Sequence, residues 1–341
     1  MSFMDRTIEA SALAGDGVLV RDTGPVLFIQ VPCYNEEATL AQVLEDMPRE
    51  IEGIGSIRIQ VIDDGSSDRT SEIAREHGVD FILRNSANKG LARSFQAGIN
   101  NAIACGADII VNTDGDHQYP GRYIADLVRP IVEGRADVVV GDRNPGANPS
   151  FSPLKRLLQR CGTTVVRNLA GVDIADAVSG FRAYSRDAAL KINVMTKFSY
   201  TTETLIHAGQ GGMTVLSVPI ETNVVTRPSR LFKSITGFMS KQALTILRSF
   251  FMYRSLSAFL SIGLTLSAIG MIPILRFVYF FLIGAGDGKI QSLVIGSLFV
   301  SVGYLTIVIA FLSDAIATNR RISEECLERL RRQDSESRKQ K

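Results

Sequence analysis

The chain has 341 residues, of which 45% are hydrophobic and 21% charged, and its formal net charge is +2. This length allows one large domain or two smaller ones. The net charge by itself says little, and no nucleic-acid partner is expected. The apolar residues are too many for a purely soluble protein and too few for a polytopic transporter.

The N-terminal residues do not have the pattern of a signal peptide. Charged side chains from Asp5 to Asp22 interrupt any apolar core, so a flexible extension is expected over residues 1–24, with the following domain in the cytoplasm. The four cysteines are widely spaced and predict reduced thiols rather than disulfides. They are Cys33, Cys105, Cys161 and Cys326.

Short β-rich runs then alternate with segments of helical periodicity. Strands are expected at Val26–Val31, Ile57–Ile62, Phe81–Leu83, Asp108–Asn112 and Asp137–Val140, with helices at Glu37–Met47, Asp68–His77 and Gly90–Cys105. This alternation predicts an α/β fold with a mostly parallel sheet flanked by helices. Further strands are expected at Val178–Tyr184 and Thr214–Ile220, and further helices at Leu154–Leu169 and Thr202–His207, within one domain over residues 25–228.

Residues 229–254 combine apolar positions at helical spacing with interspersed basic residues, among them Lys241 and Arg248. This pattern favours amphipathic helices lying on an anionic membrane surface. An ordinary core-facing helix is the alternative.

Two later stretches carry no charge and are each long enough to cross a bilayer: Leu256–Leu275 and Ile290–Ser313. We expect transmembrane helices over 255–283 and 290–313 and a polar tail over 314–341, disordered after Arg329. Arginines flank both outer ends, which predicts an inner-membrane protein with both termini in the cytoplasm. Arg276 either reaches the interface or marks a shorter span with a re-entrant bend.

Polar residues follow three of the expected strands. In parallel α/β sheets, ligands bind beyond the carboxyl ends of the strands, so these clusters are expected at one edge of the sheet. Turn formation explains any one of them but explains three acidic strand ends poorly. The clusters are Tyr34-Asn35-Glu36, Asp63-Asp64 and Asp114-Gly115-Asp116.

Asp114 and Asp116 are two residues apart, so in an extended segment their carboxylates point to the same side. Two such carboxylates repel each other unless a cation lies between them. Oxygen ligands suit Mg²⁺ or Mn²⁺, and Gln118 offers a further amide oxygen.

Several enzyme classes lack their motifs here. No Gly-X-Gly-X-X-Gly follows the first strand, and neither a P-loop nor a Gly-X-Ser-X-Gly elbow is present. His77, His117 and His207 are too scattered for a zinc site.

An ordered set of motifs resembles family 2 glycosyltransferases of the GT-A fold, in the dolichol-phosphate mannosyltransferase-like branch. The resemblance covers about residues 25–235, and the C-terminal hairpin also fits one branch. The motifs are Val31-Pro32-Cys33-Tyr34-Asn35-Glu36-Glu37, Val61-Ile62-Asp63-Asp64-Gly65-Ser66, Asn88-Lys89-Gly90, Asp114-Gly115-Asp116-His117-Gln118-Tyr119-Pro120, Ser179-Gly180-Phe181-Arg182, Glu203 and a basic element from Arg227 to Lys233.

This resemblance implies transfer of a sugar from a nucleotide-sugar, UDP-linked or alternatively GDP-mannose, to a polyprenyl phosphate, with inversion. Asp114, Asp116 and Gln118 would hold Mg²⁺ or Mn²⁺. The nucleotide-sugar site would comprise Pro32, Tyr34, Glu36, Asp63, Lys89, Asp114, Arg227 and Lys233. Asp142 replaces the family's usual serine before Arg143, and Arg230 and Phe232 replace its usual Gly and Ser.

The acceptor would be a lipid phosphate, which needs cations more than a general base. Arg143 is the first candidate for that contact, with Lys155, Arg156 and Arg160 as weaker ones; a solvated surface is the alternative for each. Asp176 is either a base or orienting group, or a cap for the following strand.

Three other classes of protein fit the sequence less well. A processive polysaccharide synthase would carry a Gln-X-X-Arg-Trp element, and this chain has no Trp. A non-catalytic nucleotide-sugar-binding scaffold conflicts with the intact acidic set, and a transporter conflicts with only two spans. A homo-oligomer is compatible with the sequence, but no specific residue supports it. Gly263, Ser267 and Gly270 offer small residues for helix packing.

Overall fold

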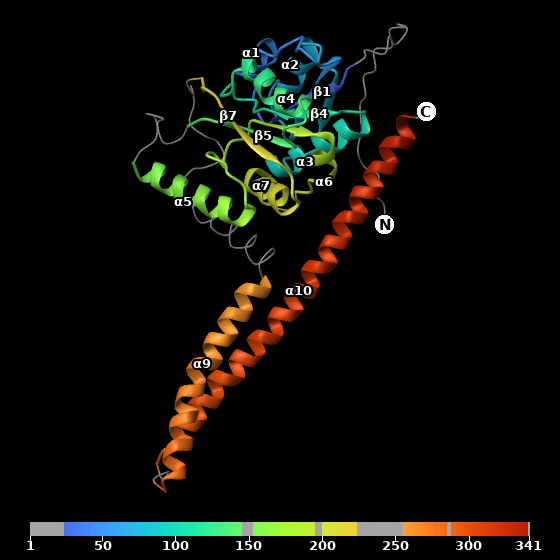
Figure 1. The fold of residues 1–341 in the computed structure, drawn as a ribbon. Helices are drawn as coiled ribbons and strands as arrows, with labels where there is room; N and C mark the ends of the chain where they lie inside the picture. The colour runs from blue at the N-terminus through green and yellow to red at the C-terminus, as the bar shows by residue number, and fades with distance from the viewer. Residues whose placement is uncertain (1–23, 145–152, 195–199, 224–254, 285–287, 340–341) are drawn as a thin grey trace. The chain divides into compact units, whose positions relative to one another are not determined.

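A computed structural model describes residues 24–144, 153–194, 200–223, 255–284 and 288–339 (Figure 1). The chain divides into two compact units. One is Met1–Ile246 together with Leu327–Lys341, and the other is Leu247–Cys326.

The first unit contains one seven-stranded sheet in the order β3-β2-β1-β4-β6-β5-β7. Every pairing is parallel except those of β6, which runs antiparallel to β4 and β5. The mostly parallel α/β sheet predicted from the sequence is thus confirmed. The strands are β1 Val26–Cys33, β2 Ser56–Asp63, β3 Phe81–Arg84, β4 Ile109–Asn112, β5 Val138–Asp142, β6 Arg182–Ser185 and β7 Val215–Pro219.

One strand begins later than predicted. β6 starts at Arg182, four residues after the predicted start at Val178. The Asp176 carboxylate accepts hydrogen bonds from the backbone amides of Val178 and Ser179, each at 3.2 Å, which turns the chain there. A side chain therefore overrides the β propensity of Val178.

Helices cover both faces of the sheet (Figure 1). Three of them, α4, α6 and the short 3₁₀ helix η1, are not among the predicted elements. The helices of this unit are α1 Leu40–Glu45, α2 Thr70–Glu76, α3 Leu91–Ala104, the short 3₁₀ helix η1 Gly121–Tyr123, α4 Ile124–Val132, α5 Pro153–Ala170, α6 Arg186–Lys191 and α7 Tyr200–Gln210.

Successive side chains of each strand point to opposite faces of the sheet. On one face Leu27, Ile29 and Val31 of β1 pack in a core with α1, α2 and α4. On the other, Phe28 stacks on Phe81 at 5.6 Å between ring centroids. Phe95 of α3 stacks there on Tyr200 of α7 at 4.1 Å.

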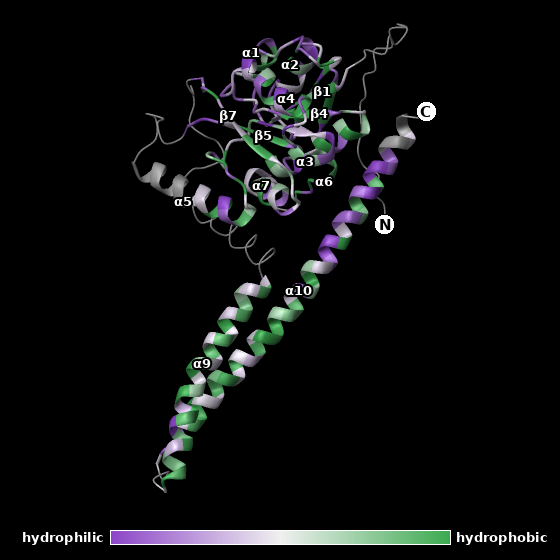
Figure 2. Cartoon of the chain, in the orientation of Figure 1, coloured by the Kyte–Doolittle hydropathy of each residue, from purple (hydrophilic) through white to green (hydrophobic). Residues whose placement is uncertain are grey.

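The second unit holds two apolar helices, α9 Ser255–Leu282 and the first part of α10 Ile290–Lys339. Both are long and apolar enough to cross a membrane. Their most apolar windows are only 11% and 17% buried, unlike the core helix of a soluble protein. Figure 2 shows apolar residues along α9 and this part of α10, and hydrophilic residues towards the end of α10.

The tail was expected to be disordered after Arg329, and this prediction is wrong. Helix α10 continues to Lys339 without a break. Pairs at i, i+4 support it: Arg320 bonds Glu324 at 2.7 Å, and Arg332 bonds Glu328 at 3.3 Å. Such pairs add a few tenths of a kcal/mol each to a polar helix.

Glycines let α9 and α10 approach closely. A Cβ on Gly263 would lie 2.8 Å from the carbonyl oxygen of Gly303, and a Cβ on Gly270 would lie 2.7 Å from that of Gly296. The small residues predicted for helix packing are therefore used within this hairpin.

We expect Gly270→Leu to lower the melting temperature of the hairpin in detergent, because the added side chain would overlap the backbone of Gly296. Overpacking of this kind costs about 1–3 kcal/mol. Ala268→Leu is the control, since Ala268 is exposed. Equal melting temperatures for the two variants would show that this contact does not hold the helices together.

Candidate functional site

The loop after β4 carries the predicted metal ligands and is fixed from two sides. The Thr39 hydroxyl donates to the carbonyl of Gly115 at 2.7 Å, which ties the loop to the start of α1. Within the loop, the backbone amide of Gln118 donates to the Asp116 carboxylate at 3.1 Å. Asn223 then donates through its backbone to the Gln118 carbonyl at 3.0 Å.

Asp114 lies in an environment that opposes its negative charge. Burial, together with the neighbouring charges of Asp116 and Glu36, raises the pKa of its carboxyl to about 7, although Arg143 and Arg182 act in the opposite direction. A carboxylate in this position is favoured when a cation lies beside it.

The residues present fit a hard divalent cation whose coordination is completed by a ligand. Among the described residues there is no group of three or more His, Cys, Asp or Glu side chains that could hold a metal. Mg²⁺, however, commonly uses one or two carboxylates together with water and substrate phosphates. Asp114, Asp116 and Gln118 match that limited set of oxygen donors.

A buried chain of amides crosses the sheet behind Asp114. Gln60 donates to Gln30 at 3.3 Å, and Gln30 donates to Asn112 at 2.9 Å. The Asn112 amide then donates to the Tyr200 hydroxyl at 2.8 Å and to the carbonyl of Gly180 at 2.9 Å. This fully satisfied network fixes the end of β4, because a buried amide without a partner is costly.

Gly180 leaves the space that the Asp114 carboxylate needs. A Cβ at this position would lie 2.7 Å from the Tyr200 hydroxyl and 3.1 Å from an Asp114 oxygen. The Gly180 loop is held in turn by Arg182, whose fully buried guanidinium donates to the carbonyls of Ser179 at 2.8 Å and Ala177 at 2.9 Å.

Arg143, predicted to contact the acceptor, forms a bidentate pair with Asp176. Its Nε donates to one carboxylate oxygen at 2.6 Å and its Nη2 to the other at 3.0 Å. The Asp176 side chain is fully buried, while the Arg143 side chain keeps 11% of its surface exposed. Asp176 therefore orients Arg143, and it also caps the turn before β6.

Arg143 and Asp176 stabilise each other's ionised forms. Although burial opposes ionisation of both groups, the Arg143 guanidinium lowers the pKa of Asp176. Tyr119 and Asp176 raise the pKa of Arg143. Burial raises the pKa of Tyr119 to about 12, so its hydroxyl stays protonated and accepts a bond from the amide of Gly180 at 3.3 Å.

The two aspartates after β2 organise neighbouring loops. Asp63 is fully buried, accepts from the Ser66 amide at 2.8 Å and lies 3.5 Å from Arg84. Asp64 accepts from the amides of Lys89 at 2.9 Å and Gly90 at 2.8 Å. The Lys89 motif predicted for the nucleotide is thus anchored by Asp64.

The remaining predicted nucleotide contacts lie where β1 ends. Pro32 is buried in β1, and the side chain of Tyr34 is exposed. The backbone amide of Glu36 donates to the Thr70 hydroxyl at 2.8 Å. Glu36 adjoins the Asp114 loop, because a Cβ on Gly115 would lie 3.2 Å from the Cγ of Glu36.

Some predicted residues lie outside the described part of the chain. Arg227, Lys233 and the predicted amphipathic helices over 229–254 are among them, as are residues 1–23. Arg156 and Arg160 belong to α5, but their side chains are outside the description.

Sequence reasoning missed the roles of Asn112, Tyr119 and Tyr200. Their contacts are long-range: Asn112 and Tyr200 are 88 positions apart. Only the polar Asn112 at the end of an otherwise apolar strand gives a local signal.

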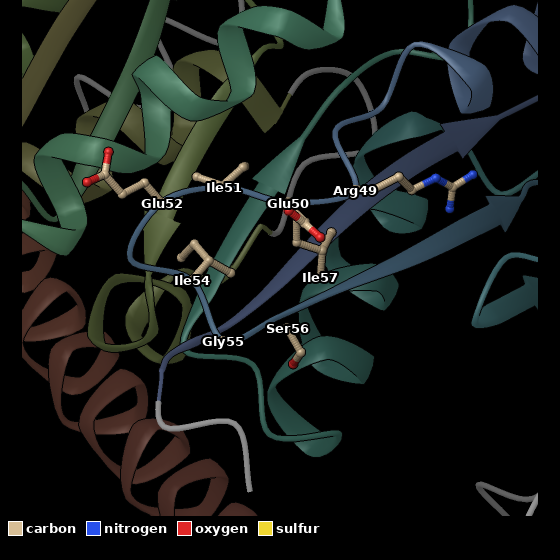
Figure 3. A pocket seen from close by; sticks show the side chains of 8 residues that line it. All are labelled: Arg49, Glu50, Ile51, Glu52, Ile54, Gly55, Ser56 and Ile57. Atoms are coloured by element: carbon tan, nitrogen blue, oxygen red, sulfur yellow. The ribbon is translucent and has the colours of Figure 1, made fainter. Parts of the chain in front are cut away.

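A surface depression elsewhere does not contribute to this site. It is lined by Arg49 to Ile57, in the segment that leads into β2 (Figure 3). That is the opposite end of β2 from Asp63. The acidic loops at the carboxyl ends of the strands are therefore the candidate site.

Comparison with known proteins agrees with this geometry. The model of the family described as Glycosyl transferase family 2 matches residues 28–192. A dolichyl-phosphate hexose transferase of Haloferax volcanii is 31% identical over 57% of this chain and 81% of its own length. A polyprenol monophosphomannose synthase of Mycolicibacterium smegmatis is 29% identical over 61% of this chain and 80% of its own. An uncharacterized protein of Methanocaldococcus jannaschii is 32% identical over 61% of this chain and 90% of its own.

The fold also resembles that of a solved structure. Glucosyl-3-phosphoglycerate synthase from Mycobacterium tuberculosis, in complex with Mn²⁺, UDP and glucosyl-3-phosphoglycerate, superposes with a TM-score of 0.53. The two chains are 20% identical, and the match covers 66% of this chain and 80% of the other. This likeness concerns the fold, and it confirms the GT-A-type architecture predicted from the motifs.

Gly180→Ala is expected to weaken Mn²⁺ binding at least tenfold, because the new methyl group would displace Asp114 or Tyr200. Adding Tyr200→Phe removes the closest clashing atom and should restore part of the affinity. Gly162→Ala is the matched control, since a Cβ there meets nothing within 4 Å. Unchanged Mn²⁺ affinity in a folded Gly180→Ala protein would contradict the arrangement.

Divalent-cation binding should depend on pH through Asp114. Because burial raises its pKa to about 7, protons compete for the carboxylate below that pH, and Mn²⁺ affinity should fall by about tenfold per pH unit. Above pH 7 the affinity should level off. Electron paramagnetic resonance of free Mn²⁺ between about pH 5 and 9 measures this, with Asp126→Asn as a surface control. An Mn²⁺ affinity that does not change with pH would be inconsistent with Asp114 as a metal ligand.

Proposed function

Because the chain belongs to glycosyl transferase family 2 and is a glycosyltransferase, we propose that it transfers a sugar from a nucleotide-sugar to a polyprenyl phosphate at a membrane. The observation that carries the proposal is the placement of two acidic ligands and one oriented arginine at a single sheet edge. The charge of Asp116 raises the pKa of Asp114, and the charge of Arg143 lowers it. A cation beside the two aspartates and an anion beside Arg143 would therefore bind next to each other. The named relatives and the two apolar helices support a lipid acceptor.

On the donor side, Asp114, Asp116 and Gln118 would hold Mg²⁺ or Mn²⁺. When bound, the metal would offset the negative charge that develops on the leaving nucleoside diphosphate. Tyr34 and Glu36 after β1, with Pro32, would border the nucleotide. Asp63 would act mainly through the loop that it shapes, because its carboxylate is already buried and bonded. Lys89, and Arg227 and Lys233 outside the described residues, would add cations near the phosphates.

On the acceptor side, the Arg143 guanidinium would bind the lipid phosphate. Its rigid pairing with Asp176 leaves only part of its surface free, which restricts the direction of approach. Arg156 and Arg160 of α5 are further candidates for this contact. A phosphate oxygen is already anionic near neutral pH, so its direct attack on the anomeric carbon would invert that centre without a strong base.

Asp176 is better suited to orientation than to proton transfer. It is fully buried, both of its oxygens accept from Arg143, and its pKa is lowered by that guanidinium. A general base near neutral pH requires a higher pKa and access to the substrate. We therefore assign Asp176 a positioning role and Arg143 the substrate contact.

The membrane arrangement completes the proposal. Helices α9 and α10 would each cross the inner membrane once, with the catalytic domain of residues 25–228 and both termini in the cytoplasm. Basic residues on the outer flanks of the spans support this topology. Residues 229–254 would then form the interfacial amphipathic helices that bring the catalytic domain to the lipid phosphate.

The direct test is a transfer assay in detergent with undecaprenyl phosphate, Mn²⁺ or Mg²⁺ and a panel of UDP- and GDP-sugars. We expect nucleoside diphosphate release with one donor, dependent on lipid and metal, and at least a hundredfold loss in Asp116→Ala. Asp126→Ala is the matched control, since the Asp126 side chain in α4 is 42% exposed. Release that persists without lipid would point to another acceptor and overturn the proposed one.

Arg143→Lys keeps the positive charge but loses the bidentate geometry. We expect a tenfold or larger drop in transfer, with nucleotide affinity unchanged, because the altered contact is on the acceptor side. Asp176→Asn should have a similar effect by loosening Arg143, and a thermal melt separates this from unfolding. Nucleotide affinity that falls together with transfer would place Arg143 on the donor side instead.

A further inference from the structure

The C-terminal segment of α10 contacts the catalytic domain at α6. Arg331 donates from Nη1 to the carbonyl oxygens of Leu190 at 3.1 Å and Ile192 at 2.9 Å. Arg332 donates to the Asp187 carboxylate at 2.9 Å. Residues 327–341 form one compact unit with the catalytic domain, whereas Leu247–Cys326 form another.

Arg331 makes the stronger of these two contacts. The last carbonyls of a helix have no partner within the helix, and a guanidinium there both donates to them and complements the helix dipole. Burial of Arg331 among these groups lowers its pKa, which indicates a desolvated contact rather than a solvated one. The Arg332–Asp187 pair has side chains that are 47% and 64% exposed, and such pairs contribute little.

We propose that residues 327–339 are a docking segment that binds the C-terminal end of α6 and forms a second attachment of the catalytic domain to the membrane hairpin. The chain runs from β7, which ends at Pro219, to α9, which begins at Ser255. Helix α10 is continuous from Ile290 to Lys339, so the docked segment connects the domain to the same hairpin from its other end. Two attachments restrict the domain more than one does, since each removes orientations that a single linker allows.

The same basic segment has another conceivable partner, the anionic membrane surface. Two observations favour α6 as the partner of this segment. Arg331 donates to a backbone carbonyl at the end of α6, and Arg332 donates to the Asp187 carboxylate. Arg329, two residues before Arg331, is exposed and serves as the comparison. A membrane-bound segment would depend on both arginines alike, whereas docking on α6 depends on Arg331.

The test is amide hydrogen exchange on the full chain in lipid nanodiscs, comparing Arg331→Ala with Arg329→Ala. We expect exchange of the amides from Leu190 to Ile192 to rise threefold or more in Arg331→Ala and to stay unchanged in Arg329→Ala. Asp187→Asn should change it less than twofold. Equal exchange in all variants, or an equal rise for both arginines, would overturn the docking.

A second measurement concerns the consequence for transfer, which rests on the proposed function. In vesicles containing undecaprenyl phosphate, Arg331→Ala should slow transfer by three- to tenfold, while transfer to a short-chain, water-soluble prenyl phosphate in detergent stays unchanged. An equal loss with both acceptors would overturn the attachment role and make the segment a support for the domain itself. If the unaltered protein transfers to neither acceptor, the proposed function fails, and hydrogen exchange alone decides the docking.

Discussion

The site depends on one electrostatic constraint, the burial of the Asp114 carboxylate next to a second carboxylate. Burial and the charge of Asp116 hold its pKa near 7, and the guanidinium of Arg143 offsets only part of that cost. A group in this situation favours a bound cation, and the surrounding structure preserves the situation. Gly180 gives the carboxylate room, and the Asn112–Tyr200 hydrogen bond fixes the strand end from which it projects.

Arg143 and Asp176 place a positive charge opposite this acidic pair. Their bidentate contact aligns the guanidinium, and the exposed remainder of Arg143 is available to an anion. Two anionic reactants can meet only where cations separate their charges. In the proposed reaction, a metal at Asp114 and Asp116 would serve the diphosphate, and Arg143 would serve the lipid phosphate.

The membrane hairpin follows a different principle, close packing of backbones. Gly263 against Gly303 and Gly270 against Gly296 leave no space for a Cβ atom at these four positions. These glycines are therefore occupied within one chain, which weakens their use as evidence for an oligomer. Docking of residues 327–339 on α6 would make the same hairpin hold the catalytic domain from both ends.

The sequence by itself determined the strand-and-helix alternation, the acidic strand ends and the two apolar spans, because periodicity and turn residues are local properties. It identified Asp114, Asp116 and Arg143 as candidates but left Asp176 open between base, orienting group and cap. Only the tertiary structure paired Asp176 with Arg143, 33 positions away, and joined Tyr200 to Asn112. It also extended the polar tail as a helix and brought Arg331 to α6, 139 positions from Ile192. Such contacts depend on where the fold places distant segments, and hydrophobic periodicity carries no information about that placement.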